Sequence, residues 1–130
     1  MCTVLVVDDE SDLLELYTDI LEVMGYHVIQ AHDGWQALEI AHRERPDLIV
    51  TDWMMPRLDG VELCLRVLKD PALRTVPIIL HSSRRAPHLP GIHVLSKGCP
   101  LEEFEDTVAE VLDGASNALP ISEEASRLAC

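Results

Sequence analysis

The chain has few aromatic residues, few basic residues and no long apolar run. Aromatic residues make up 4% of the 130 positions, and ten lysines and arginines stand against 23 aspartates and glutamates, for a net charge of −13. Such an acidic chain is a poor direct ligand for nucleic acid or an anionic membrane. No segment approaches the roughly 20 apolar residues of a membrane-spanning helix, and the N-terminus lacks a signal-peptide pattern. We therefore expect a cytoplasmic protein with no direct nucleic-acid or membrane partner.

Zinc and thiol-redox motifs are also missing, because the four cysteines include no CxxC pair. Hydrophobic residues nevertheless make up 48% of the chain, and its length is enough for the core of one domain. We expect this domain to span residues 1–113. Glycine, serine, asparagine and proline gather after it, so residues 114–130 are predicted to be a flexible C-terminal tail or linker.

Five short runs rich in valine, isoleucine and leucine lack clean polar alternation, which is typical of strands buried on both faces. Helical periodicity fills the first three gaps and follows the last run, with helices expected to start at Ser11, Asp33, Asp59 and Leu101. The runs are TVLVV, HVIQA, DLIVT, PIILH and HVLS. This alternation predicts an α/β fold, a doubly wound parallel sheet with helices on both faces. Ligands of such sheets bind at the carboxyl ends of the strands.

Five polar side chains fall where these strands end: Asp8, Asp9, Asp52, Ser82 and Lys97. Each alone has a simpler explanation as a helix-start acid, a turn residue, a cap or a solvated charge. Their coincidence at one edge of one sheet favours a functional site. Three carboxylates in one place need a cation, and oxygen ligands of this kind suit Mg²⁺. A lysine and a hydroxyl beside them could hold a phosphoryl group.

The segments VLVVDDE, AHDGWQALE, PDLIVTDWMMPRLDGVEL, PIILHSS and LSKG together resemble the receiver domain of two-component response regulators. The resemblance runs from about Val4 to Asp113 and is most specific around Asp52. Within the family, the chain is similar to the chemotaxis-type members, which consist of a single domain. The resemblance implies a flavodoxin-like fold with five parallel strands in the order 2-1-3-4-5.

The resemblance also implies a role for each site residue. Asp52 would be the phosphoacceptor, taking a phosphoryl group from a sensor histidine kinase or a phosphotransfer protein. Mg²⁺ would be held by Asp8, Asp9, Asp52 and the backbone carbonyl of Met54. Ser82 and Lys97 would contact the phosphoryl group. The chain would then be a signalling protein that acts through a downstream protein target, with only self-catalysed phosphoryl transfer and autodephosphorylation, and not an enzyme in the usual sense.

Two positions beside the lysine depart from the family pattern. Gly98 follows Lys97, where the family usually has a proline after a cis peptide bond. A cis bond before a non-proline residue costs about 2.5–4 kcal/mol, so either the surroundings enforce it or the bond is trans. Val94 stands where the family often has a tyrosine or phenylalanine that changes rotamer on phosphorylation. That aromatic switch cannot operate in this chain.

The interval between Ser82 and Lys97 is roughly two helical turns shorter than in the family and contains Pro87 and Pro90. An interior proline costs a helix about 3 kcal/mol. We therefore predict that the fourth helix of the family is absent or reduced to one turn. In the family this helix belongs to the face used for output and dimerisation. Its loss should expose apolar surface, which predicts a homodimer or an obligate partner.

Two other functions remain open at this point. The chain could be a receiver-like interaction module whose output is independent of phosphorylation, because its lysine loop and fourth helix are altered. It could also be a flavodoxin or a phosphatase. A flavin phosphate would need a glycine- and hydroxyl-rich loop after the first strand, where DDE would repel it. A phosphatase of the paired-acid type would need an acid where Met54 stands.

Overall fold

The computed structural model describes residues 1–116, which form five strands and four helices. Of the tail predicted over 114–130, residues 117–130 lie outside the described residues, and the domain boundary at residue 113 stays a prediction. The last helix continues past that boundary to Ser116. The elements are β1 (Thr3–Val7), α1 (Ser11–Val23), β2 (His27–Ala31), α2 (Gly34–Glu44), β3 (Leu48–Thr51), α3 (Gly60–Lys69), β4 (Ile78–Ser82), β5 (Ile92–Ser96) and α4 (Leu101–Ser116).

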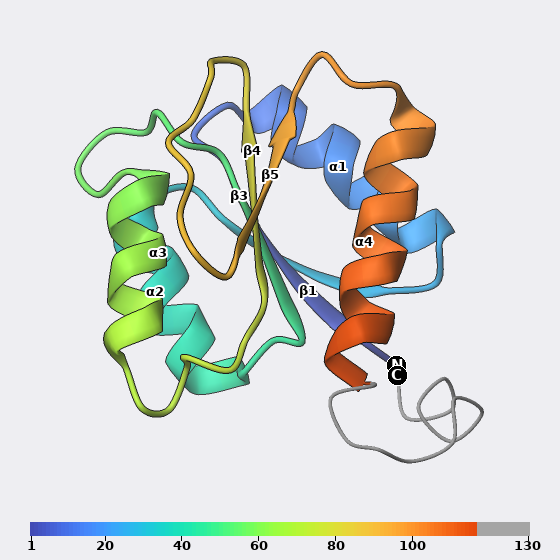
Figure 1. Ribbon diagram of the computed structural model, residues 1–130. Coiled ribbons are helices and arrows are strands. Elements are labelled where there is room, and N and C mark those ends of the chain that lie inside the picture. The colour runs from blue at the N-terminus through green and yellow to red at the C-terminus, as the bar shows by residue number, and fades with distance from the viewer. Residues whose placement is uncertain (117–130) are drawn as a thin grey trace.

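The strands form one parallel sheet in the order β2-β1-β3-β4-β5. Helices α2 and α3 cover one face of the sheet, and α1 and α4 cover the other (Figure 1). The predicted flavodoxin-like, doubly wound fold is therefore confirmed. Because all strands run in one direction, their carboxyl ends meet at one edge, where a ligand site is expected.

The sheet separates two apolar cores. Leu5 and Val7 of β1 pack into the core on the α2 and α3 side, whereas Val4 and Val6 pack into the core under α1 and α4. Successive strand residues point to opposite faces. The inner strands are covered on both faces and are apolar at most positions, which explains why their sequences lack polar alternation, whereas the edge strands β2 and β5 are partly exposed.

The four predicted helix starts are confirmed, but the predicted cap of α1 is wrong. Asp33 and Asp59 cap α2 and α3, and their Oδ1 atoms accept hydrogen bonds from the third residue of each helix. Ser11 is the first residue of α1 and does not cap it. The cap residue is Glu10, which makes no side-chain cap bond. Its N–H donates to Asp8 Oδ1 at 3.0 Å, and this Asx turn leads the chain into the helix.

No helix connects β4 and β5 in the described chain, as predicted. Residues 83–91 instead run as an irregular crossover on the α3 side of the sheet (Figure 1). Ala86 and Leu89 are half-buried and pack against the core that α2 and α3 cover. The crossover therefore covers part of the surface that the missing helix would leave, and Val94 on β5 stays 40% exposed. Within residues 1–116, no helix is both long and apolar enough to span a membrane.

Candidate functional site

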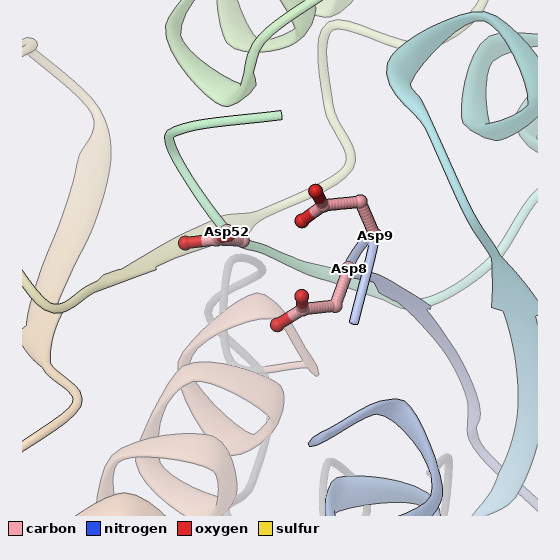
Figure 2. Close-up of side chains that lie close together, drawn as sticks. All are labelled: Asp8, Asp9 and Asp52. Atoms are coloured by element: carbon pink, nitrogen blue, oxygen red, sulfur yellow. The ribbon is translucent and has the colours of Figure 1, made fainter. Parts of the chain in front are cut away.

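Three carboxylates meet at the carboxyl edge of the sheet. Asp8 and Asp9 follow β1, and Asp52 follows the neighbouring strand β3 (Figure 2). One oxygen from each of the three lies within 4.8 Å of the others. Asp8 and Asp52 are buried, whereas Asp9 is exposed. The structure thus brings together the three acids that the sequence predicted to be neighbours, and leaves one of them open to solvent.

The position of Asp52 is fixed by its backbone and by the loop that follows it. Its N–H donates to the carbonyl of Val7 at 2.9 Å, and its Oδ1 accepts from the N–H of Trp53 at 2.8 Å. Gly60 then closes the loop, since its N–H donates to the Trp53 carbonyl at 2.7 Å. A Cβ atom on Gly60 would lie 2.0 Å from the carbonyl oxygen of Asp52. Only glycine can therefore begin α3 against the backbone of Asp52.

Lys97 points into the carboxylate cluster from the end of β5. Its Nζ lies 3.0 Å from Asp8 Oδ2 and 3.3 Å from Asp52 Oδ1, and its side chain is 13% exposed. Every peptide bond in residues 1–116 is trans, including the bond between Lys97 and Gly98. Of the two alternatives that the sequence left open, the trans bond is the one found, and the lysine still reaches the acids.

The charges at the site are strongly coupled. Burial raises the pKa of Asp52, the ammonium of Lys97 lowers it, and the neighbouring Asp8 raises it again, with a net increase. Burial acts to lower the pKa of Lys97, but its bonds to Asp8 and Asp52 outweigh that effect and the pKa is raised. The lysine is therefore charged at neutral pH. One ammonium does not neutralise three carboxylates, which leaves a net negative site suited to a cation.

Ser82 and Met54, the two other predicted site residues, differ in burial. Ser82 is buried at the end of β4, its Oγ accepts from the N–H of Arg84 at 3.1 Å, and its carbonyl accepts from the N–H of Lys97 at 2.8 Å. Met54 lies in the loop between β3 and α3, two residues after Asp52, with its side chain 54% exposed. The metal-binding role of its carbonyl stays a prediction.

An ion pair that the sequence did not indicate fastens the loop after Asp52. Arg57 lies in the left-handed region with a φ of 72°, and its Nη1 contacts Asp33 Oδ2 at 2.9 Å. The same loop packs tightly on the start of α2, where a Cβ atom on Gly34 would lie 2.5 Å from the carbonyl oxygen of Leu58. These contacts hold the loop after Asp52 against α2. An arginine at a position that needs a positive φ gave no recognisable signal.

A buried histidine next to the site was also missed. The His81 ring lies between Tyr17 of α1 and Phe104 of α4, with ring centroids 4.8 Å and 5.1 Å away. Burial, and then the charge of Lys97, lower the pKa of His81 to about 4. The ring is therefore neutral under ordinary conditions. A histidine inside the apolar run of β4 was the signal that could have identified it.

The donor set fits the metal that the sequence suggested. The three carboxylates offer only oxygen atoms, which Mg²⁺ prefers, and the exposed Asp9 leaves room for the waters that this ion keeps. The charged Lys97 lies at the same acids. An anion with several oxygens, such as a phosphoryl group, could contact both the cation and the ammonium here.

Comparisons with known proteins agree with this geometry. The family model of the response regulator receiver domain matches residues 4–98. The alkaline phosphatase synthesis transcriptional regulatory protein PhoP of Bacillus subtilis is 43% identical over 81 residues, which cover 62% of this chain and 33% of PhoP. The polar-differentiation response regulator DivK of Brucella anthropi is 35% identical over 77 residues, covering 59% of this chain and 63% of DivK. The chain spans about a third of the length of the first curated relatives it matches.

Solved structures show the same fold. The receiver domain of a signal transduction histidine kinase from Syntrophus aciditrophicus superposes with a TM-score of 0.84 at 29% identity, covering 94% of this chain and 98% of that one. The response regulator TrrA from Thermotoga maritima, solved in complex with Mg²⁺ and BeF, gives a TM-score of 0.79 at 26% identity, covering 85% and 99%.

Proposed function

The chain belongs to the response regulator receiver domain family, and on that premise we propose that it accepts a phosphoryl group on Asp52. The donor would be the phosphohistidine of a sensor kinase or of a phosphotransfer protein. The carboxylate cluster with Lys97 at its centre is the observation that carries this proposal. The chain would act as a signalling protein and would catalyse only its own phosphorylation and dephosphorylation.

Mg²⁺ is the cofactor of the proposed reaction. Its ligands would be Asp8, Asp9, Asp52 and the backbone carbonyl of Met54. When bound, the ion would neutralise negative charge on the phosphoryl oxygens and on the acids that surround them. The all-oxygen donor set and the exposed Asp9 support this assignment, as does the Mg²⁺ complex of the Thermotoga relative.

The chain's own residues would carry the transfer. A carboxylate oxygen of Asp52 attacks the phosphorus, a new O–P bond forms, the N–P bond to the donor histidine breaks, and the leaving imidazole nitrogen takes up a proton. Lys97 is close enough to Asp52 to pair with an oxygen of the incoming group. Burial of Asp52 keeps bulk water from its carboxylate before the transfer.

Ser82 would report the phosphorylated state. Its hydroxyl is held by the N–H of Arg84, and a phosphoryl group on Asp52 would offer it a more strongly negative acceptor. Turning toward that group would release the Arg84 bond and shift the start of the crossover. Because Val94 stands where the family often has an aromatic residue, a partner would detect this movement of the crossover without an aromatic switch.

Two kinds of partner follow from the proposal besides the phosphodonor. One is a downstream protein target, and the other is a second copy bound through the face where the fourth helix is missing. Val94 of that face remains exposed. Because several curated relatives are named as transcriptional regulators and extend well beyond the matched segment, the expectation of no direct nucleic-acid contact applies to the receiver domain alone.

The proposal is tested by incubating the protein with Mg²⁺ and a small phosphodonor and measuring its mass. We expect one phosphoryl group on the wild type, none on Asp52→Asn, and a normal level on Asp106→Asn, which changes an exposed acid of α4. The label should disappear when the metal is chelated. Absence of label on the wild type with Mg²⁺ present would refute the proposal.

A second candidate is a receiver-like module whose output does not depend on phosphorylation. The crossover that replaces the fourth helix favours it, because the output face is rebuilt in the unphosphorylated protein. The two candidates differ in one measurement, the affinity for a captured target. Equal affinities of the phosphorylated wild type and of Asp52→Asn would favour the second candidate.

A further inference from the structure

Lys97 lies on a turn that must be held without the family's proline. Strand β5 ends at Ser96, and the chain then passes through Lys97 and Gly98 to Cys99 with trans peptide bonds. Glycine is the most permissive residue for the backbone, so the sequence at Gly98 does not by itself fix where the lysine points. Some other contact has to supply that constraint.

Ser96 makes two of the three hydrogen bonds that hold this turn. Its Oγ accepts from the N–H of Gly98 at 3.1 Å, and its carbonyl accepts from the N–H of Cys99 at 3.1 Å. The third bond runs from the N–H of Lys97 to the carbonyl of Ser82 at 2.8 Å. A serine hydroxyl that bonds the backbone two residues ahead fixes a local turn. The hydroxyl of Ser96 therefore closes the turn at Gly98.

Three packed rings also lie next to the turn. The imidazole of His81 lies against the backbone of Ser96 and is enclosed by the rings of Tyr17 and Phe104. His81 and Leu95 are neighbours across the β4–β5 pair, as are Ser82 and Ser96. Besides the strand pairing, the aromatic packing and the backbone bond from Cys99 to Ser96, the hydroxyl of Ser96 is the side-chain contact that holds the chain at Gly98.

We propose that Ser96 is a positioning residue for Lys97, whose hydroxyl replaces the constraint of the family's proline. The turn places the ammonium 3.0 Å from Asp8 and 3.3 Å from Asp52. Without the hydroxyl, the segment after β5 gains freedom and the lysine spends less time at the acceptor. This inference rests on the proposed function, because it assigns Ser96 a part in phosphoryl transfer to Asp52.

The test compares rates of Asp52 phosphorylation by a small phosphodonor with Mg²⁺ in the wild type and in Ser96→Ala, Ser96→Thr, Lys97→Ala and the double variant Ser96→Ala with Lys97→Ala. We expect Ser96→Ala to slow phosphorylation about fivefold, the loss typical of one hydrogen bond. Threonine keeps the hydroxyl, so Ser96→Thr should restore most of the rate. Ser83→Ala, at an exposed serine of the crossover, should react like the wild type.

The double variant separates positioning from general stability. If Ser96 acts through Lys97, then Ser96→Ala should cause no further loss once Lys97 is alanine. A wild-type rate for Ser96→Ala, an equal loss in Ser96→Thr, or an undiminished loss in the Lys97→Ala background would each overturn the inference. A wild type that takes no label would instead refute the proposed function, and the inference with it.

Discussion

At the scale of single residues, Asp52 lies where its own charge is unfavourable. Asp52 is 8% exposed, and burial together with the neighbouring Asp8 raises its pKa even though Lys97 opposes the shift. An acid whose pKa is raised by folding weakens the folded state while it is ionised, and this cost disappears as the pH falls through its folded-state pKa. The ionised carboxylate of Asp52 therefore lowers the stability of the folded protein.

We therefore predict that Asp52→Asn stabilises the protein at pH 7 without Mg²⁺, by on the order of 1 kcal/mol. Thermal unfolding should show a higher midpoint for the variant. Adding Mg²⁺ should raise the midpoint of the wild type more than that of the variant, because the folded wild type binds the ion more tightly. Asp106→Asn serves as the control, and a lower midpoint for Asp52→Asn without metal would contradict the prediction.

His81 makes stability depend on pH in the acid range. Its pKa falls from 6.5 to about 4 on folding, first through burial and then through the charge of Lys97. Below pH 6.5, His81 binds a proton in the unfolded chain but stays neutral in the folded chain. The free energy of unfolding therefore falls as the pH falls from about 6.5 to about 4. We predict that this ring accounts for up to about 3 kcal/mol of that loss. Urea unfolding of the wild type and His81→Leu at several pH values should show a shallower decline in the variant.

His42 affects the pH dependence of stability in the opposite direction to His81. Its pKa is raised, chiefly by the bond of its Nε2 to Asp70 Oδ2, and further by the bond of its Nδ1 to the carbonyl of Leu38. Both partners are acceptors, so both bonds together require the doubly protonated ring. The stability that His42 contributes is complete below pH 6.5 and is lost as the pH rises through the folded-state pKa. A parallel pH dependence of His42→Gln and His81→Leu would contradict these assignments.

At the scale of elements, the crossover between β4 and β5 acts as a cover for the core. Leu89 is half-buried and packs on the core under α2 and α3. We predict that Leu89→Ala lowers the free energy of unfolding by about 1–2 kcal/mol, less than a fully buried leucine would lose. Leu65→Ala, at a leucine of α3 that is 41% exposed, is the matched control. Equal effects of the two changes on urea unfolding would show that the crossover covers nothing.

The strands and most helix ends could be predicted because their signals are local. A strand buried on both faces must be apolar at nearly every position, as in TVLVV, and an aspartate such as Asp33 caps a helix through a bond to a residue three positions ahead. The cap of α1 could not be predicted, because Glu10 takes that place next to the turn at Asp8, which belongs to the site. Local sequence determines where strands and helices form, whereas the residues that cap and join them also depend on tertiary contacts.

The residues of the site can also be divided into those that the sequence could place and those that it could not. Asp8, Asp9 and Asp52 could be placed together because parallel strands end at one edge. The direction of Lys97 could not, since it depends on a trans turn held by Ser96. The contacts of His81 join three elements that are far apart in sequence, and no spacing rule connects them.

At the scale of the whole molecule, charge is distributed unevenly. The chain carries −13 overall, yet no acidic residue occurs between Asp70 and Glu102, a stretch that contains Arg74, Arg84 and Arg85. This stretch forms β4, the crossover and β5, next to the strongly acidic helix α4. Two copies that meet on this face would carry like net charges, and salt would screen their repulsion.

We predict that the protein self-associates through the face at Val94 and that dimers increase as the salt concentration rises from about 50 mM to about 500 mM. Sedimentation velocity measures the distribution. Val94→Glu should shift it toward monomers, whereas Val23→Glu, at a valine that is 88% exposed at the end of α1, should not. A monomer at high concentration under all these conditions, binding no apolar dye, would exclude this interface.

The missing helix also changes how the chain can fold. Residues 83–91 join β4 to β5, whereas residues 8–26 join β1 to β2 across α1, so the first connection is roughly half as long as the second. Halving a loop lowers its closure cost by ~0.6 kcal/mol, and shorter sequence separation favours faster contact formation. The β4–β5 pair is therefore a local unit that can form early and offer Ile79 and Leu80 as a template for β3. In kinetic terms, the edge that carries Lys97 is a place where folding can begin.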